Sequence, residues 1–536
     1  MANEVSLEQL DQPTGKLIEE LSGQGSRPAY SHSTHDHVRQ LAYGAYLKAD
    51  QKGTGKPDEP GQAENIVRFF TTLRGIRRKQ GFFSDQLGFP QKDLVRLALL
   101  HRRLDEHGVT VGGRVYSAIE HVEQVSRRRA DYMENRPRTA PSGLDLWPRI
   151  QENKKRIQAK MRMSDQDWNS YSGQMTNAVD SLITLSQIVD LPEKALIDLM
   201  RATKTFRMRI TPYFASLIMA DTPNDPVMLQ CVPTGEMLDA PGKSKPPICR
   251  AHSPARLVDQ IYPSTVAIKC TNTCPVYCTH CVRREFIGDR DVTYPVQAYS
   301  DAIEYVRGNK QITDVLLTGG DPLMLPDKLI AWLLTQLDRI PHVRTKRIGT
   351  RVPVALPHRV SQQLLDILGK SNDAKPVRIF THINSAREIT PLSRQVLKKL
   401  STNVAGVLNQ AVLLRGVNDS RDRMWSLCEH LLGAYVKPHY LMQCSERHPQ
   451  FAHLRVPVSV GRGLVESMYG NLPGDAIPRY VALSTGKVPL ASSHVIQSGG
   501  NKVVLCRPWD GQEVVYQDAD TGAYKDPKFG FARYEE

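Results

Sequence analysis

The stretch KCTNTCPVYCTHC, residues 269–281, places Cys274, Cys278 and Cys281 at the spacing C-x3-C-x2-C. Three thiolates on one short loop can bind three irons of a cubane cluster and leave the fourth iron open to another ligand. A zinc knuckle or plain buried thiols are the alternatives. The spacing lacks the second ligand pair of a zinc knuckle, and no nearby histidine has the usual zinc spacing. The stretch therefore predicts a 4Fe-4S cluster bound by these cysteines.

The segments around and after this loop alternate between strand-like and helix-like patterns. Helix-like segments such as DKLIAWLLTQLDRI (327–340) repeat apolar residues at helical spacing. Strands that alternate with helices are typical of parallel sheets with crossover helices, so the fold class is α/β, a partial (β/α)6 barrel. The predicted strands are TVAIKC (265–270), TDVLLTG (313–319), TKRIGTR (345–351), PVRIFTHI (376–383), VAGVLNQAVLL (404–414) and VKPHYLMQC (436–444).

Chemically capable residues follow these strands at their carboxyl ends, where barrels concentrate their chemistry. The cysteine loop follows the first strand, Gly319-Gly320-Asp321 ends the second, Arg351 ends the third and His382 lies near the end of the fourth. Two glycines in a row expose bare backbone at a point of close approach. We expect Gly319, Gly320 and Asp321 to contact S-adenosylmethionine (SAM), whose amino and carboxylate groups would occupy the open iron.

Composition excludes several classes of protein. The 536 residues include 40% hydrophobic ones, and no apolar run is long enough to span a membrane, for which about 18 residues are needed. Four of the nine cysteines crowd into residues 270–281, so we expect metal binding in a reducing, cytoplasmic compartment. The net charge of +14 is spread along the chain, and short arginine runs such as 127–129 fit solvated helix faces. Binding to nucleic acid is therefore not expected.

From residue 164 to residue 498 the chain resembles lysine 2,3-aminomutase and its amino-acid aminomutase relatives, which are radical SAM enzymes. The similar segments occur in the family's order along this range. They include SDQDWNSY, RMRITPYFASLI, CPVYCTHCVRR, LLTGGDPL, RIGTRVPVALPHR, THINSAREIT, LNQAVLLRGVND, KPHYLMQC and GKVPL.

The resemblance implies an isomerase that moves the α-amino group of an amino acid to Cβ and uses pyridoxal 5′-phosphate (PLP) as a second cofactor. Lys487 stands where the family has its Schiff-base lysine. Tyr262 matches a tyrosine that lies against the pyridine ring, and Arg283 matches the arginine that binds the substrate carboxylate. The resemblance also places His382 and Gln410 on the SAM side of the site, and His280, inside the cysteine loop, is expected to pack near the adenine of SAM. Ordinary packing in the barrel core is the alternative for these three residues.

The chain differs from the family at the residues that bind the distal ammonium of a lysine substrate and the phosphate of PLP. Where lysine-specific members have two aspartates for the distal ammonium, this chain has Ser445 and Leu483, with Glu446 next door. Because an ammonium buried without carboxylates is destabilised by several kcal/mol, we do not expect lysine bound in the familiar way. Glu446 could bind a cation if its loop shifts, so arginine or a modified lysine stays open, whereas a neutral or shorter side chain fits Ser445 and Leu483 better. The family's phosphate-binding arginines read Ile261 and Thr265, so another basic residue has to bind the PLP phosphate.

The expected organisation has five parts. They are a loosely ordered leader (1–60), an extra helical region (61–155), a helical aminomutase region (160–262), the radical SAM barrel (263–445) and a C-terminal PLP-lysine segment (446–536). The expected partners are a small amino-acid substrate, an electron donor such as flavodoxin or ferredoxin, and further copies of the chain. Two other hypotheses stay open: a radical SAM enzyme without PLP, and an enzyme that modifies a macromolecule bound by its N-terminal region.

Overall fold

The computed structural model describes residues 139–520. The positions left out of this range are 190, 192, 220, 223–224, 239–252, 484–485, 492–494, 500 and 507–510. The chain divides into two units, Met1–Pro137 and Arg138–Glu536, and the described residues belong to the second. The predictions for the leader and for most of the extra helical region therefore lie outside the described residues.

Short helices form the first part of the described chain. Side-chain caps start several of them: Ser164 forms a capping box with Asp167, and Ser170, Ser181 and Thr211 each accept a hydrogen bond from a backbone N–H in the first turn. Their apolar faces share one core that includes Ile150, Leu185 and Phe214. The helices are α6 Trp147–Met161, α7 Asp165–Trp168, α8 Tyr171–Thr176, α9 Leu182–Ile188, α10 Glu193–Thr203, α11 Pro212–Ala215, α12 Met228–Cys231 and η3 Gly235–Met237.

A curled sheet follows, and in the described part of the chain it has nine strands in the order β1 to β9. Strands β2 to β8 are parallel, whereas β1 and β9 are antiparallel edge strands. All six predicted strands are confirmed, as β2 to β7. The strands are β1 Val258–Tyr262, β2 Thr265–Thr271, β3 Asp314–Gly319, β4 Thr345–Thr350, β5 Val377–Thr381, β6 Gly406–Leu413, β7 Lys437–Gln443, β8 Arg479–Leu483 and β9 Lys487–Pro489.

The strand β8 extends the parallel sheet beyond the six strands expected from the sequence. It is only five residues long, and no crossover helix follows it in the described part of the chain. The alternation of strands and helices therefore did not indicate a strand within the predicted C-terminal segment. Its pairing with β7 puts the chain around Lys487 on the same sheet as the cysteine loop. The partial barrel is thus longer at its C-terminal edge than the sequence indicates.

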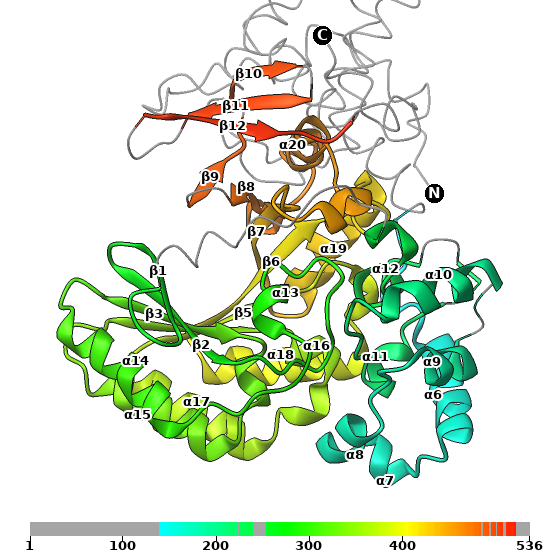
Figure 1. Cartoon of the computed structure of the whole chain (residues 1–536), viewed down its shortest axis with the longest axis horizontal. Helices are drawn as coiled ribbons and strands as arrows, with labels where there is room; N and C mark the ends of the chain where they lie inside the picture. The colour runs from blue at the N-terminus through cyan, green and yellow to red at the C-terminus, as the bar shows by residue number, and fades with distance from the viewer. Residues whose placement is uncertain are drawn as a thin grey trace, which may run out of the picture. The chain divides into compact units, whose positions relative to one another are not determined.

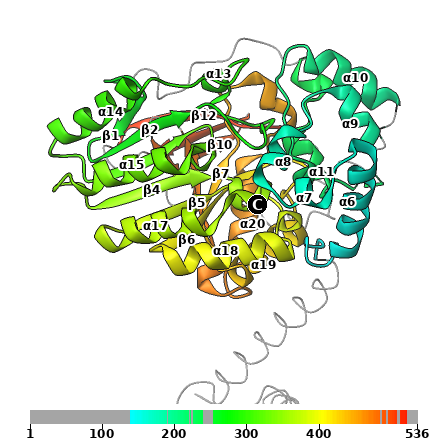
Figure 2. The same cartoon turned by 90° about the horizontal axis from the view of Figure 1, so that it is seen from below.

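Crossover helices cover the outer side of the sheet (Figure 1), and Figure 2 shows α14, α15, α17 and α18 side by side. The longer ones are amphipathic and bury one face, as Ile330, Leu333 and Leu337 do in α15. These helices are α14 Val296–Gly308, α15 Asp327–Asp338, α17 Gln362–Ala374, α18 Pro391–Asn403, α19 Arg421–Gly433 and α20 Val458–Glu466. Shorter turns are α13 Arg284–Ile287, η5 Pro322–Met324, α16 Val352–Ala355, η6 Pro357–Arg359, η7 Ala386–Glu388, η8 Pro449–Leu454 and η9 Gly474–Ala476.

The two faces of the sheet differ in burial. Along β4 and β6 fully buried and half-buried residues alternate, as expected for a pleated strand with one face under helices. Lys346 on the buried face is fully covered and donates to Ser371 at the end of α17. Arg347, the next residue, points to the opposite face, where its guanidinium lies 5.4 Å from the centroid of the Phe380 ring. This inner face lines the lumen of the partial barrel.

The two edges of the sheet meet at Lys487. Its backbone N–H, at the start of β9, donates to the hydroxyl of Tyr262 at the end of β1 over 2.9 Å. In a partial barrel the two edge strands do not pair with each other, so each leaves a row of backbone N–H and C=O groups without a strand partner. This hydrogen bond joins the edges, so residues at opposite ends of the sheet face one lumen.

A small antiparallel sheet packs on the C-terminal end of β7. It consists of β10 Val495–Gly499, β11 Lys502–Cys506 and β12 Glu513–Gln517. The buried Tyr516 donates its hydroxyl to the Cys444 carbonyl over 3.1 Å, and Asp518 accepts from the Val458 backbone N–H over 3.0 Å. No helix in the described part of the chain is long and apolar enough to cross a membrane.

Candidate active site

The three cysteines of the predicted cluster line one cavity of about 340 Å³, together with residues of α13, residues 205–207, and His448 and Gln450. All three are free thiols, and burial raises the pKa of Cys274 and Cys281. Soft sulfur donors that converge on one cavity are the ligands that iron–sulfur clusters require. The residues therefore fit a cluster, and the structure brings together the three residues that the spacing predicts.

Cys270 is different, although it lies only four residues before Cys274. Its side chain is fully buried in β2, its thiol lies 3.4 Å from the Ile268 carbonyl, and burial raises its pKa to about 12. Cys270 is therefore a strand residue of the core.

The helical part of the chain holds the cysteine loop in place. Thr279 donates its backbone N–H to the Gln230 carbonyl and its hydroxyl to the Leu229 carbonyl, over 2.9 and 2.7 Å. Arg209 makes two further contacts with the loop. Its carbonyl accepts from the Tyr277 N–H over 3.0 Å, and its guanidinium donates to the Cys274 carbonyl over 3.3 Å. The loop is thus positioned by residues more than 40 positions away in the chain.

The glycine pair after β3 packs directly against the start of the cysteine loop. Gly319 has φ +118°, and a Cβ there would lie 2.4 Å from the Thr271 carbonyl oxygen. A Cβ on Gly320 would lie 2.5 Å from the Thr273 carbonyl oxygen. The glycines are therefore needed for the close approach of β3 to the loop, and this approach puts their backbone beside the cysteines.

The Asp321 carboxylate accepts several hydrogen bonds from neighbouring residues of the protein. It accepts from the Thr350 hydroxyl over 2.7 Å and from the backbone N–H groups of Leu323, Arg351 and Val352. Its side chain joins the ends of β3 and β4. A SAM contact from this segment would therefore come from the glycine backbone.

We predict that Gly319→Ala destabilises the protein by at least ~2 kcal/mol, because it combines a left-handed backbone conformation with a backbone clash. Urea unfolding measures the effect. Gly349→Ala is the matched control, because a Cβ there meets its nearest neighbour, the Thr318 hydroxyl, at an ordinary 3.6 Å. Equal stability of both variants would contradict the prediction.

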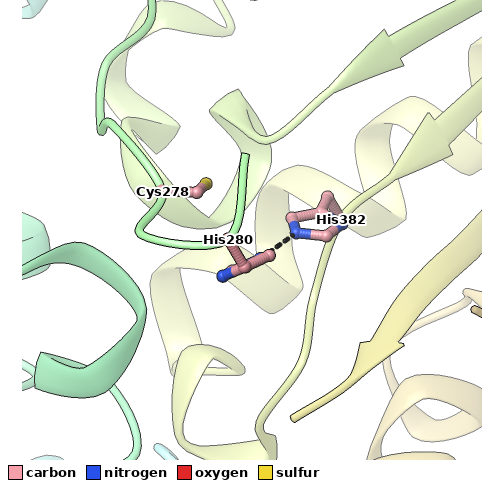
Figure 3. A group of neighbouring side chains, drawn as sticks. All are labelled: Cys278, His280 and His382. Atoms are coloured by element: carbon pink, nitrogen blue, oxygen red, sulfur yellow. Dashed lines mark hydrogen bonds between the residues drawn. The ribbon is translucent and has the colours of Figure 1, made fainter. Parts of the chain in front are cut away.

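His280 and His382 form a direct pair beside the cluster loop (Figure 3). Their Nε2 atoms lie 2.9 Å apart, and His382 Nδ1 lies 3.0 Å from the Gln410 carbonyl. Burial lowers the pKa of both imidazoles, that of His382 to about 4, so both are neutral. Because a carbonyl only accepts, His382 Nδ1 carries the proton, and His280 Nε2–H donates to His382. The structure thus brings together the three residues that we expect near SAM.

The Cys278 sulfur and the two imidazoles lie within 4.8 Å of one another, a group that could bind one metal ion. Two imidazoles on one zinc ion stand about 3.3 Å apart, given tetrahedral geometry and Zn–N bonds of about 2.0–2.1 Å. The observed 2.9 Å between the Nε2 atoms is shorter and typical of a hydrogen bond. The pair is therefore better described as hydrogen-bonded imidazoles.

A second group of side chains surrounds Lys487. Its ammonium lies 5.6 Å from the ring centroid of Tyr262 and 5.3 Å from that of Tyr440. Burial, together with the charges of Arg347 and Arg283, lowers the pKa of Lys487 to about 8. A half-buried lysine of lowered pKa near two aromatic rings fits the aldehyde and the flat ring of PLP.

Arg283 connects the two groups of residues. It is the N-cap of α13, two residues after Cys281, and it acts electrostatically on Lys487. In the described part of the chain no carboxylate pairs with its guanidinium, whereas Arg347 is paired with Asp314. Arg283 thus offers an unneutralised cation near both the cluster loop and the lysine.

At the two positions where lysine-specific relatives have aspartates for the substrate ammonium, this chain has Leu483 and Ser445, which carry no carboxylate. Leu483 pairs with Lys487 across the β8–β9 hairpin, and the Ser445 hydroxyl accepts from the Arg447 N–H over 3.2 Å. The Glu446 carboxylate accepts from the Gln517 backbone N–H over 2.7 Å, so it is bound to β12. The hydrogen bond therefore holds the Glu446 side chain against β12.

Three residues of the site were given no role from the sequence: Tyr440, His439 and Arg347. The available signal was their place on half-buried positions of β4 and β7. Strand alternation could have assigned Arg347 and Tyr440 to the lumen, but not the adjacent His439 as well, because Asn409 pairs with Pro438 and Gln410 with Tyr440, so His439 is the extra residue of a β-bulge. Their distance from Lys487 also depends on how far the sheet curls. His439 lies 4.3 Å from the Tyr440 ring and 5.5 Å from the Phe380 ring, measured between ring centroids.

Fold and site together define a radical SAM protein, and residues 268–423 match the radical SAM superfamily. The chain is 34% identical to a glutamate 2,3-aminomutase of Clostridioides difficile over 405 residues, which cover 75% of this chain and 94% of that protein. It is 36% identical to an L-lysine 2,3-aminomutase of Clostridium subterminale, over 66% of this chain and 86% of that one. An L-lysine 2,3-aminomutase of Bacillus subtilis is 34% identical, over 70% and 79%. The chain belongs to this family of radical SAM aminomutases, whose members are isomerases.

Proposed function

We propose that the chain is a PLP-dependent amino-acid 2,3-aminomutase, which moves the α-amino group of a small amino acid to Cβ. One observation carries the proposal: the ammonium of the half-buried Lys487 lies 5.6 and 5.3 Å from the ring centroids of Tyr262 and Tyr440, and the charge of Arg283, two residues after Cys281, acts on it. A radical SAM enzyme that did not use PLP would have no need for a half-buried lysine of lowered pKa at this place. Relatives named as 2,3-aminomutases add support.

The cluster and SAM would supply the radical, and PLP would supply the aldehyde that binds the amino group. The chain itself would bind and orient these cofactors and the substrate. Cys274, Cys278 and Cys281 would bind the cluster, and the glycine backbone with the His280–His382 pair would position SAM. Lys487 would bind PLP, with Tyr262 against its ring. A pKa of about 8 leaves a useful fraction of the Lys487 amine unprotonated near neutral pH.

Arg283 would orient the substrate. A planar guanidinium can bind both oxygens of a carboxylate, and this holds the amino acid in one direction. Its position between the cluster loop and Lys487 would put the substrate between the radical source and the amine-binding group. Such positioning of reacting groups is a main source of rate enhancement.

The substrate class follows from the residues at the far end of the lumen. Ser445 and Leu483 stand where lysine-specific relatives have aspartates, and Glu446 is bound to β12. We therefore propose an amino acid whose side chain carries no ammonium. The proposal further includes a cytoplasmic location, a flavodoxin or ferredoxin as electron donor, and a homo-oligomer.

The test is turnover of free amino acids by the full-length protein. We expect that anaerobic incubation with SAM, dithionite, PLP and each of the twenty amino acids gives a β-amino acid from at least one of them, detected by mass spectrometry. Lysine is expected to be a poorer substrate than the best of the others. The proposal would be contradicted if a preparation with full cluster and bound PLP formed no β-amino acid. The proposed substrate class would be wrong if lysine were the best substrate.

A further inference from the structure

Arg351, the residue before α16, makes a contact with the cluster loop that the family resemblance does not assign. Its Nη1 lies 3.0 Å from the Cys278 sulfur, within hydrogen-bonding distance for a sulfur acceptor. The side chain is buried, with 6% exposed, and its guanidinium lies 4.9 Å from the centroid of the Phe214 ring. A cation is thus held against one ligand of the proposed cluster.

Buried acceptors hold this guanidinium in one position. Its Nη2 donates to Glu388 Oε2 over 2.8 Å and to Gln230 Oε1 over 2.6 Å. Glu388 is fully buried and is itself fixed, because its other oxygen accepts from the backbone N–H groups of Asn384 and Ser385. The Arg351 backbone N–H is also bound, by Asp321. Both ends of the residue are therefore anchored.

Guanidinium groups keep their proton in proteins. Burial alone would lower the pKa of Arg351, but Glu388 and the Cys278 sulfur raise it overall. A hydrogen bond with one charged partner is roughly twice as strong as a neutral one. A fixed charge at this place therefore acts on the electronic state of whatever Cys278 binds.

We propose that Arg351 sets the reduction potential of the cluster through its hydrogen bond to the Cys278 sulfur, with Glu388 and Gln230 as the groups that position it. Reduction of the cluster from the 2+ to the 1+ state adds one electron from an external reductant, and this adds one negative charge beside the guanidinium. The cation stabilises the reduced state more than the oxidised state. Hydrogen bonds to sulfur and local charge are known controls of cluster potentials.

This inference depends on the cluster that the proposed function requires, so the experiment measures cluster content and potential separately. The full chain and its variants Arg351→Gln and Arg351→Lys are reconstituted with iron and sulfide under anaerobic conditions. Iron and sulfide are quantified, and the cluster is then titrated without SAM while its reduced form is followed by electron paramagnetic resonance. Arg359→Gln is the matched control, because Arg359 is also buried and paired with a carboxylate, Asp327, but contacts the Leu325 carbonyl in place of a sulfur.

We expect Arg351→Gln to lower the ratio of reduced to oxidised cluster about tenfold at a fixed potential, a shift of about 59 mV to more negative values for one electron. Arg351→Lys keeps the charge but not the two-pronged geometry, and its potential should lie between those of Arg351→Gln and the parent. Arg359→Gln should match the parent. If Arg351→Gln fails to hold a cluster, Arg351→Lys decides: a shift to more negative values supports the proposal, and the parental potential overturns it.

Other outcomes separate this inference from the proposed function. A full cluster in Arg351→Gln with the parental potential overturns the role of Arg351 and leaves the aminomutase proposal standing. An equal shift in Arg359→Gln overturns it too, because the effect would then be a general one of buried charge. A parent protein that binds no cluster overturns both.

Discussion

Cys278→Ser is expected to abolish turnover of every amino acid and to reduce bound iron sharply. The three cysteines line one cavity, and each thiolate would bind a different iron, so no neighbour can take over the missing bond. A serine hydroxyl keeps the size of the side chain, but it is a hard oxygen ligand that does not lose its proton readily. The measurements are iron and sulfide per chain after anaerobic reconstitution, and β-amino acid formation.

Cys270→Ala is the control for this variant. Cys270 lies four residues before Cys274 but is buried in β2, away from the cavity, and should not bind iron. We expect the parental iron content, with a loss of stability of about 1 kcal/mol from the deleted sulfur. Iron loss in Cys270→Ala equal to that in Cys278→Ser would mean that the assignment of the cluster ligands is wrong.

Lys487→Ala is expected to abolish the covalent attachment of PLP and to lower turnover to background. Lys487 is the lysine that lies near the rings of Tyr262 and Tyr440, and an alanine there offers no amine to the aldehyde. Borohydride reduction of the PLP-treated protein followed by peptide mass spectrometry locates the modified residue. The exposed Lys502 in β11 provides the control variant Lys502→Ala, which should keep both attachment and activity.

The lowered pKa of Lys487 adds a pH dependence to this prediction. An ordinary lysine has a pKa of about 10.4, whereas burial and the charges of Arg347 and Arg283 bring that of Lys487 to about 8. Only the neutral amine attacks the aldehyde, so the rate of PLP attachment should rise with pH and level off above about pH 8. A rate that still rises steeply near pH 10 would show that Lys487 is an ordinary exposed lysine.

The cysteine loop and the six predicted strands could be derived from the sequence because both depend on local pattern. The spacing from Cys274 to Cys281 lies within eight residues, so any fold that keeps the loop tight keeps the thiolates close. The segments of β2 to β7 are strand-like and separated by amphipathic helices, and that alternation has few stable arrangements other than a parallel sheet. Lys487 and Tyr262 carry no such local signal, and only the resemblance to the aminomutases predicts that they bind PLP.

Other features were decided by tertiary structure. Tyr262 and Lys487 are 225 positions apart, and they meet only because the sheet curls until its edge strands touch. The contact of Arg351 with the Cys278 sulfur depends on the order of strands β2, β3 and β4, and the engagement of Glu446 depends on where β12 packs. Pattern and spacing report what lies along one element, whereas the distance between elements depends on the curl and packing of the whole sheet, which many distant residues determine together.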